Sequence, residues 1–505
     1  MRAWSASAVK ATVPVAQEAR RLGMAVEYAG RLAPVIWVTG TPQQVRALAQ
    51  TDGILDVYPS QQTSLTMSIA GPTDQADYSY ANGHRGAGSR VAVVEYANVD
   101  WSNGHLSGSC HSSDSTTGVI VTHNHPAWVS GAIVGQLASQ RGVAPSACLI
   151  SIGTGGEQGG GTDDWRILAA IDLAVLEHDA QVINLSIVQN TSAGQSALRD
   201  YIDHVVRTYG VHVAASGGNP EQCGDTPGPV LSPGTAWNVV TVGTLKDRRT
   251  TTWADDVVNT KCSVDPPGGP FKPEVSAPGT DVTSAGIYFG TGPLASIAVP
   301  QVAGTFAQLI GINPGELAAS PIRTKAIILA ASHVHMVAAG GEPYRLDDEE
   351  GIGSLTSKWS DIVAKRQVYE GYPLGGFGRV QFDATYQGPC YEYNGGWKTF
   401  TISTKPGRYV RVVVDWFSHA FYNKGTNGYD PADIHSDQLR TDLDLVVTGN
   451  GETYTSRWHN GYNVAWVQFV ASTDTYTGII EVYGGWSCTV ASEPAGWAYV
   501  SWNWS

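Results

Sequence analysis

The stretch from Leu294 to Gly304 reads LASIAVPQVAG and places a single serine, Ser296, at the start of a run of small and apolar residues. This run predicts a helix with Ser296 in its first turn. A serine in this position caps the N-terminus of many helices. The same position also brings a nucleophile close to free backbone N–H groups and to the positive end of the helix dipole. The role of Ser296 therefore depends on what the rest of the chain supplies.

Composition and charge narrow the class of protein. The chain has 505 residues, of which 58 are glycine, with 15% charged residues and a formal net charge of -14. This length exceeds that of one ordinary domain. The acidic balance argues against nucleic acid as a partner, because that partner requires a basic face. No apolar run reaches the length that a bilayer requires, so we expect no membrane contact.

The six cysteines are far apart in the sequence and lack the C-x-x-C spacing of zinc sites. An even number of scattered cysteines beside few lysines is typical of disulfides in an oxidising compartment, which predicts a secreted or extracellular protein. The N-terminus shows no recognisable signal peptide. We expect each bridge to stay within one region, which pairs Cys110 with Cys148, Cys223 with Cys262, and Cys390 with Cys488.

The hydrophobic pattern divides the chain into three regions. Residues 1–66 mix helical patterns with short apolar strands and predict a small α+β unit. Residues 67–388 alternate continuous apolar strands, such as 91–94 and 182–186, with helical stretches. This alternation predicts an α/β domain whose mainly parallel sheet is covered by helices on both faces. Residues 389–505 alternate with period two between turns and predict an all-β sandwich.

Three polar residues lie near strand ends, where parallel sheets bind their ligands. Glu95 ends an apolar strand, a place where a carboxylate is more often solvated than catalytic. His125 stands in a loop just before a helix that Pro126 begins. Asn219 follows a strand in a tight turn, where it either serves the turn or donates its amide to a developing oxyanion. Each residue alone is a weak signal.

Together these segments resemble the motifs of the subtilisin-like serine peptidases. The family's aspartate motif ends a hydrophobic strand, as Glu95 does, and its histidine motif, HGTHVAG, aligns without gaps on HPAWVSG at residues 125–131. Its serine motif, GTSMAxPHVAG, aligns on residues 294–304. Further matches follow in the family's order, and an ordered series is a stronger signal than any single motif. They lie at 142–145, 182–186, 215–219, 277–279 and 376–380.

The resemblance implies a serine endopeptidase, or a related acyl hydrolase, that acts on a peptide or protein substrate without a cofactor for its chemistry. Ser296 would attack the carbonyl carbon, and His125 would take its proton. Glu95 would orient the imidazole, and Asn219 would donate to the oxyanion. Asp100, which repeats a second acid of the family's motif, is an alternative orienting group.

The flanking regions also resemble parts of this family. Residues 1–66 resemble its propeptide, a chaperone and inhibitor that would bind the cleft and be cut around residues 63–70. Residues 389–505 resemble its prepeptidase or convertase-type sandwich. There Asp442 and Asp444 share one face of a predicted strand, where they either bind structural calcium or simply face water. We expect a monomer.

Several positions depart from the family's motifs, mostly where the family has small residues. This loss predicts a filled or reshaped pocket and a narrow or altered specificity. The alternative is a pseudopeptidase, in which the fold serves as an inactive binding or structural module. The replacements are Glu95 for aspartate, Pro126-Ala127-Trp128 for Gly-Thr-His, Val188-Gln189 for Gly-Gly, Leu294-Ala295 for Gly-Thr, and Gln301 for histidine.

Overall fold

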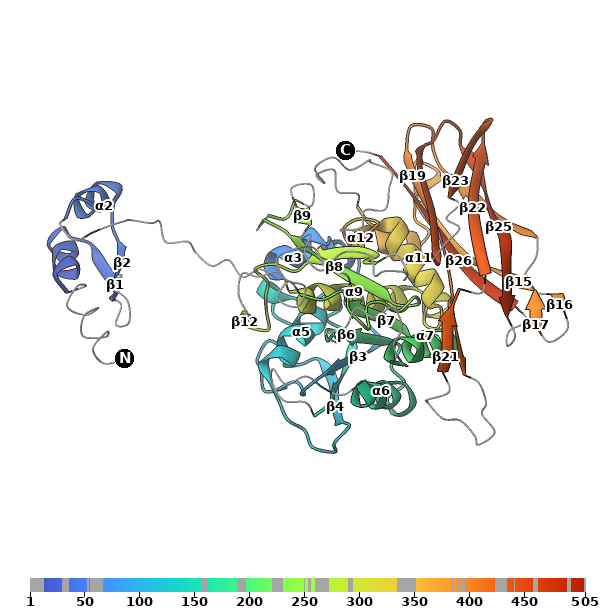
Figure 1. The fold of residues 1–505 in the computed structure, drawn as a ribbon. Helices are drawn as coiled ribbons and strands as arrows, with labels where there is room; N and C mark the ends of the chain where they lie inside the picture. Colours follow the sequence, from blue (N-terminus) through green and yellow to red (C-terminus); the bar gives the residue numbers. More distant parts are fainter. Residues whose placement is uncertain are drawn as a thin grey trace. The chain divides into compact units, whose positions relative to one another are not determined.

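The chain forms two compact units, Met1–Ser64 and Leu65–Ser505, in a computed structural model (Figure 1). Each unit is described by itself. The structure describes residues 13–29, 36–51, 54, 67–155, 162, 164–188, 197–219, 230–248, 250–252, 256–258, 272–288, 294–333, 351–383, 385–387, 390–392, 396–422, 434–439, 441–456, 462–487 and 492–503.

The first unit is a small α+β structure. Strands β1 (Ala25–Ala29) and β2 (Ile36–Thr39) pair in an antiparallel ribbon. A helix over residues 13–21 precedes them, and α2 (Pro42–Leu48), which begins with proline, follows. Among the described residues of this unit, four apolar side chains are buried, namely Ala16, Ala19, Met24 and Leu48.

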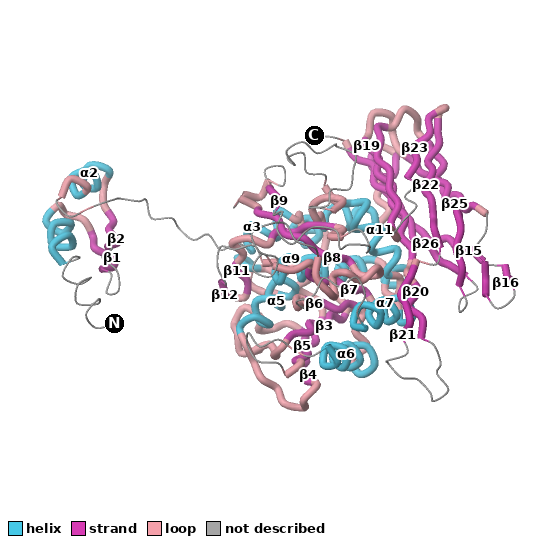
Figure 2. Tube along the Cα trace, viewed as in Figure 1, coloured by secondary structure: helices cyan, strands magenta, loops and turns pink. Residues whose placement is uncertain are grey.

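The second unit is built on a sheet of seven parallel strands, as the alternating pattern predicts (Figure 2). The strand order is β10-β8-β7-β6-β3-β5-β4, so the first strand of the sheet, β3 (Arg90–Glu95), lies between β5 and β6. The other strands are β4 (Cys110–Ser115), β5 (Cys148–Gly153), β6 (Val182–Leu185), β7 (His212–Ser216), β8 (Val240–Lys246) and β10 (Val275–Pro278), with the short antiparallel β9 (Val257–Val258) beside β8.

Helices cover both faces of this sheet, because neighbouring residues of each strand point to opposite sides. Val91 and Val93 of β3 join one core cluster, whereas Ala92 and Val94 join another. The first cluster includes α5 (Asn124–Val134), α9 (Ala295–Ile312) and α11 (Pro321–Ala331), and the second includes α6 (Asp164–Asp172) and α7 (Ala197–Tyr209). The shorter elements are α3 (Met67–Thr73), α4 (Ala76–Ala81), a 3-10 turn (Ala138–Gln140), a π turn (Leu173–Glu177), α10 (Pro314–Leu317), α12 (Ser357–Ala364), and the two-residue strands β11 (Thr283–Ser284), β12 (Ile287–Tyr288), β13 (Val368–Tyr369) and β14 (Tyr372–Pro373).

Helix α9 corrects one expectation from the sequence. Among the described residues it is the one helix that is long and apolar enough to cross a membrane by length and composition, with a mean hydropathy of 1.4. The expectation that no apolar run reaches this length is therefore wrong. In the protein 89% of the helix is buried, between the sheet and α5. Its apolar surface is thus used for packing inside the domain.

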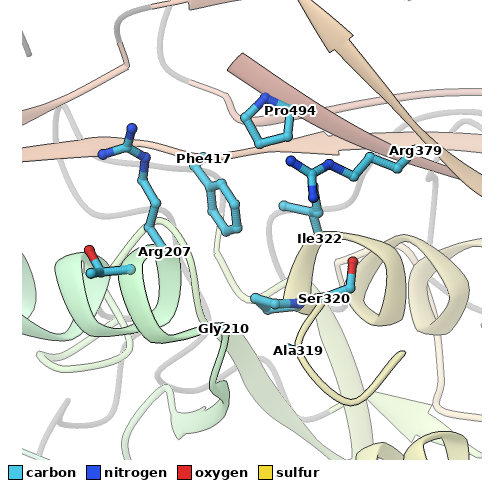
Figure 3. Close-up of a pocket in the computed structure, with 10 residues that line it drawn as sticks. Arg207, Gly210, Ala319, Ser320, Ile322, Arg379, Phe417 and Pro494 are labelled. Atoms are coloured by element: carbon cyan, nitrogen blue, oxygen red, sulfur yellow. The ribbon is translucent and has the colours of Figure 1, made fainter. Parts of the chain in front are cut away.

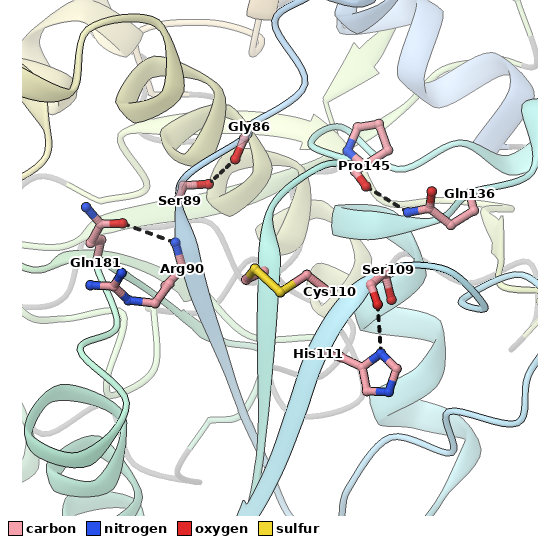
Figure 4. Close-up of a disulfide and its surroundings, with 10 residues drawn as sticks. Gly86, Ser89, Arg90, Ser109, Cys110, His111, Gln136, Pro145 and Gln181 are labelled. Carbon is pink, nitrogen blue, oxygen red and sulfur yellow. Dashed lines mark hydrogen bonds between the residues drawn. A yellow bond between two sulfur atoms is a disulfide. The ribbon is translucent and has the colours of Figure 1, made fainter.

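A disulfide joins β4, an edge strand of the parallel sheet, to its neighbour β5 (Figure 4). Cys110 of β4 and Cys148 of β5 are direct neighbours in the parallel register, with Cα atoms 4.5 Å apart. This confirms the predicted pairing of these two residues. The side chains of the other two predicted pairs, Cys223 with Cys262 and Cys390 with Cys488, lie outside the described residues.

The C-terminal region is the predicted β-sandwich, whose two antiparallel sheets enclose a core of their own. Trp416 belongs to this core, whereas Trp466 is buried in the core cluster of the parallel-sheet region. One sheet contains β15 (Gly375–Asp383), β26 (Ser492–Trp502), β19 (Tyr409–Trp416) and β24 (Val464–Val470). The other contains β16 (Thr385–Gln387), β17 (Cys390–Glu392), β25 (Thr475–Ser487), β22 (Thr441–Gly449), β23 (Glu452–Ser456) and β18 (Trp397–Ser403), and a separate ribbon pairs β20 (His419–Tyr422) with β21 (Ile434–Gln438).

Strand β15 contains the GFGRV segment that the resemblance assigns to the end of the peptidase region. In the structure it pairs along its length with β26, so the sandwich begins at Gly375. The glycines of this segment have a packing role. A Cβ on Gly378 would lie 2.6 Å from the Trp497 ring, and one on Gly376 would lie 2.9 Å from the Tyr499 ring. The motif therefore lets two aromatic rings of β26 lie flat on β15.

A buried network of charges joins the sandwich to the parallel sheet. Lys325 of α11 places Nζ 2.9 Å from Glu274 Oε1 and 3.5 Å from Asp415 Oδ1 of β19. Lys272 Nζ also contacts Glu274. All four side chains are at most 4% exposed. Burial raises the pKa of Asp415 to about 7, against the lowering effect of the Lys325 charge.

Beside this network, a buried arginine attaches the same strand to α11. Arg411 of β19 is fully buried and donates to the carbonyl oxygens of Leu329, at 3.2 Å, and Ser332. These carbonyls lie at the C-terminal end of α11, where a cation is favourable. Strand β19 therefore contacts the helix through charged side chains as well as through apolar ones.

Replacing Lys325 with Met should strongly destabilise the second unit, because Asp415 would lose its nearest cation inside the protein. Removing one partner of a buried ion pair typically costs about 3–5 kcal/mol. Denaturant unfolding followed by tryptophan fluorescence measures the change. The matched control is Lys405→Met, which breaks an exposed pair with Glu370 (2.7 Å) and should cost about 1 kcal/mol or less. Equal effects of the two substitutions would contradict the role given to the network.

Candidate active site

The residues singled out from the sequence converge on one edge of the parallel sheet. Glu95 is the last residue of β3, and Asn219 lies just beyond the end of β7. His125 is in the first turn of α5, and Ser296 is in the first turn of α9. Strands β3, β6 and β7 are neighbours, so their carboxyl ends bring these side chains together at the place where such sheets bind ligands.

Glu95 contacts the histidine that the alignment pairs with it. Its Oε2 lies 3.2 Å from His125 Nδ1, within hydrogen-bond reach. Glu95 is fully buried, whereas the side chain of His125 is 20% exposed. Burial lowers the pKa of His125, but the charge and the hydrogen bond of Glu95 act against it, and the net pKa lies above the ordinary 6.5. A glutamate can thus reach the imidazole from this strand end.

Asp100, the alternative orienting group, is engaged elsewhere. It is exposed, and its Oδ1 accepts bonds from the backbone N–H of Ser102 at 2.9 Å and from the Ser102 hydroxyl at 2.7 Å. These bonds lower the pKa of Asp100. The geometry therefore favours Glu95 over Asp100 as the partner of His125.

Ser296 is buried to 6% exposure and is held on both sides by Ser186, which follows β6. The Ser296 hydroxyl donates to the carbonyl oxygen of Ser186 at 3.2 Å, and the Ser186 hydroxyl donates to the carbonyl oxygen of Ser296 at 3.1 Å. The Asn184 amide in turn donates to the Ser186 hydroxyl at 2.9 Å. Sequence reasoning gave Ser186 no role, although it closes one of the matched strands.

Asn219 lies at the same helix start. Its Oδ1 accepts a hydrogen bond from the backbone N–H of Ala295 at 2.8 Å, one residue before Ser296. This bond fixes the plane of the amide beside the first turn of α9. An amide in this place can donate from Nδ2 to an oxygen that develops charge near Ser296.

Two residues beside His125 were missed in the sequence, although they adjoin the matched motifs. The Tyr96 hydroxyl contacts Nδ1 of His123, which caps α5 by accepting from the backbone N–H of His125 at 3.1 Å. The ring centroids of Tyr96 and His125 are 6.0 Å apart. This cap holds the start of α5 and with it the backbone of His125. Sequence adjacency to Glu95 and His125 was the available signal.

The substituted motif positions have ordinary structural explanations. The Trp128 indole is 1% exposed, packs in the core and donates to the carbonyl oxygen of Val282 at 3.1 Å. Leu294, before the serine, has φ of −126°, which any residue adopts. Gln301 is fully buried and donates to the carbonyl oxygen of Pro278 at 2.6 Å. The indole therefore faces the core, and the leucine requires no glycine-like backbone.

The substitution of Val188-Gln189 for Gly-Gly is only partly described. Val188 is half-buried, and Gln189 lies outside the described residues. The effect of Val188 and Gln189 on the shape of the predicted substrate pocket therefore stays a prediction.

The predicted calcium ligands lie on β22. Asp444 is 2% exposed and faces Glu481 of β25 in the register, whereas Asp442 is half-buried. Across the described part of the chain, no group of three or more His, Cys, Asp or Glu side chains could hold a metal ion. The calcium site therefore stays a prediction, and no chemical step depends on it.

Comparison with known proteins assigns the family. The model of the subtilase family, Peptidase_S8, matches residues 73–354, more than half of the chain. The chain belongs to the subtilase family. The match includes all four candidate residues and ends near the sandwich. The subtilases are serine proteases, so the chain has the fold and the family membership of a subtilisin-like serine protease.

Individual subtilases share moderate similarity with the chain. Serine protease AprX of Bacillus subtilis (strain 168) is 26% identical over 310 residues, which cover 54% of this chain and 69% of AprX. The prenylagaramide maturation protease PagA is 22% identical, covering 57% of this chain and 97% of PagA with a TM-score of 0.45. A cold-adapted subtilisin-like serine proteinase is 21% identical, covering 54% and 90%, with a TM-score of 0.40.

The Glu95 carboxylate should hold the pKa of His125 above 6.5 in this subtilase, and Glu95→Gln should lower it. NMR titration of the imidazole measures both values. Because the folded pKa exceeds the unfolded one, the ion pair stabilises the fold below about pH 6.5, and this contribution is lost as the pH rises through the folded pKa. Glu95→Asp, which retains the charge, is the control. An unchanged pKa in Glu95→Gln would contradict the contact.

Proposed function

We propose that the chain is a serine endopeptidase with narrow or altered specificity. Ser296 is the nucleophile, His125 the general base, Glu95 the orienting carboxylate and Asn219 the oxyanion donor. The observation that carries the proposal is the bond between Glu95 and His125 on the sheet edge that also holds Ser296 and Asn219. Family membership supports the reaction class, and the resemblance of the sequence to the family's motifs supports the choice of these four residues.

The acylation step starts from the Ser296 hydroxyl. The hydroxyl turns from the Ser186 carbonyl toward Nε2 of His125, which takes the proton as Oγ attacks the carbonyl carbon of the substrate. Glu95 stabilises the resulting imidazolium through Nδ1. The imidazolium then gives its proton to the leaving amine, which departs and leaves an acyl group on Ser296. In the second half of the reaction His125 takes a proton from water, the water oxygen attacks the acyl carbon, and the acid product leaves as Ser296 regains its proton.

The tetrahedral intermediate carries a negative oxygen that needs donors close by. Nδ2 of Asn219 and the backbone N–H of Ser296 supply them, and the positive end of the α9 dipole adds to the stabilisation. The bond from Ala295 to Asn219 Oδ1 supports this assignment, because it orients the amide before the substrate binds. A donor that is already oriented needs no rearrangement during the reaction.

A pseudopeptidase is the second candidate function, and one observation favours it. Ser296 is 6% exposed, and its hydroxyl donates to a backbone carbonyl of its own chain. A serine fixed in this way could serve only to join α9 to the end of β6. Whether Ser296 reacts with a probe for activated serines therefore distinguishes the peptidase from the pseudopeptidase.

We further propose the roles that the family resemblance gives to the flanking regions. The separate first unit supports a propeptide that binds the cleft. The disulfide between Cys110 and Cys148 supports an oxidising compartment and hence secretion. We also propose that the protein is a monomer and that Asp442 and Asp444 bind a structural calcium ion on the sandwich.

A fluorophosphonate probe should label the mature protein on Ser296. Labelling should disappear in Ser296→Ala and fall strongly in His125→Ala, because the probe reacts with an activated serine. In-gel fluorescence and mass spectrometry of the labelled peptide measure the result. Asn219→Ala should retain the nucleophile and lower the turnover of a peptide substrate by about a hundredfold or more.

The folded state of each variant is verified by its thermal unfolding midpoint. Folded wild-type protein that acquires no label dependent on Ser296 would exclude the peptidase and leave the pseudopeptidase. Label on another residue would exclude the assigned nucleophile.

The active protein should cut its own chain between the two units, around residues 63–70. Ala70 is buried within α3 (Met67–Thr73), so we expect the cut before this helix. N-terminal sequencing of purified wild type identifies the new end, and Ser296→Ala should stay intact. A cut of equal extent in Ser296→Ala would assign it to another protease.

A further inference from the structure

A pocket of about 300 Å³ lies between the parallel-sheet region and the sandwich, away from the candidate active site (Figure 3). Its floor is the turn from Ala319 to Ile322 at the start of α11. Arg207, near the end of α7, lines one side, and Arg379 of β15 lines the other. Phe417, which follows β19, lies between the two arginines (Figure 3). Pockets between structural layers of this size are typical of small-molecule sites.

Close backbone packing forms the floor of this pocket. A Cβ on Gly210 would lie 3.0 Å from the carbonyl oxygen of Ala319, and Gly210 has φ of +68°. A Cβ on Gly496 of β26 would lie 2.5 Å from the carbonyl oxygen of Ile322. The end of α7 and the sandwich strand are therefore both pressed against the start of α11. The pocket is a defined part of the fold.

The charge around this pocket is positive, in a chain whose net charge is -14. Arg379 donates to the neutral side chain of Gln381 at 2.9 Å, and no acid pairs with it within the described residues. The nearby Glu316 is occupied by Arg366, at 2.8 and 3.1 Å, and by Arg323, at 3.9 Å. Burial lowers the pKa of Arg323, and the positive charges of Arg379 and Arg366 lower it further. The charge of Glu316 raises this pKa but does not outweigh the lowering effects. Positive charge thus exceeds negative charge here.

The floor of the pocket adds a helix N-terminus with an unusual cap. Ser320 is the N-cap residue of α11, an 11-residue helix, yet its side chain makes no capping bond. The residue is 8% exposed, and its Oγ has no hydrogen-bond partner among the residues described. Buried hydroxyls are normally satisfied. Figure 3 shows the Ser320 hydroxyl pointing up from the helix start toward the side of Arg379.

We propose that this pocket binds a small organic oxyanion, a carboxylate or a phosphate, whose apolar part lies against Phe417, Ile322 and Pro494. The Arg379 guanidinium and the Ser320 hydroxyl donate to the oxyanion, and the start of α11 favours its negative charge. Arg207 adds positive charge from the opposite side. Phe417 and Ile322 are 7% and 2% exposed, so the apolar wall consists of side chains that are packed in the core. The site is separate from Ser296 and needs no catalysis.

Isothermal titration of the full chain carrying Ser296→Ala, which prevents self-cleavage, tests the site. The probes are benzoate, phenyl phosphate and inorganic phosphate, titrated at constant ionic strength. We expect saturable binding of an aromatic probe that is tighter than that of inorganic phosphate. Arg379→Gln should weaken it by roughly tenfold or more, and Ser320→Ala should weaken it several-fold, because charge-assisted hydrogen bonds are lost.

The matched control is Arg46→Gln, which removes one exposed positive charge from the first unit and should leave binding unchanged. Benzoate binding alone supports a carboxylate ligand, phenyl phosphate binding alone supports a phosphate ligand, and binding of both supports the shared oxyanion chemistry. Failure of all three probes to bind at millimolar concentration overturns the proposal. Binding that survives both Arg379→Gln and Ser320→Ala overturns it as well. Loss of probe labelling at Ser296 would not affect this result.

Discussion

The burial of helix α9 is the constraint on which the rest of the structure depends. Its side chains are covered by the sheet, by α5 and by α12, so the helix has no solvent-exposed face along most of its length. Its position is therefore fixed by packing on all sides, and Ser296 in its first turn is fixed with it. The ends of β6 and β7 then supply Ser186 and Asn219 at bonding distance. The precision of the site is a consequence of this packing.

The sequence was sufficient for the architecture and for the residues that meet at the sheet edge. Periodicity alone separates continuous apolar strands from alternating ones, and this difference distinguishes the parallel sheet from the sandwich. The sequence was not sufficient to predict the direction in which a given side chain points. Trp128 seemed able to fill the cleft, yet its indole turns into the core because the Val282 carbonyl accepts its N–H. The rotamer depends on a partner about 150 residues away in the chain.

Interactions between distant segments also explain the other differences. The sequence indicated no apolar run long enough for a membrane span, although helix α9 as a whole has that length and composition. Strand β15 looked like the end of the peptidase region, but its hydrogen-bond partner, β26, lies more than 100 residues later. Ser186 ends one of the matched segments, but its contact with Ser296 follows only from the position of α9. Such pairings exist only once the chain is folded.

The charges that join α11 to β19 bear on how this domain arrangement can change in evolution. A sandwich attached by apolar contact alone could be lost or exchanged in one step, leaving a surface that a few polar substitutions would make soluble. Here the loss of β19 would remove Asp415 and Arg411, so that Lys325 would keep only Glu274 as an acidic partner and the α11 carbonyls would lose their arginine donor. We therefore expect the sandwich and the parallel-sheet region to be inherited together and to diverge together in evolution.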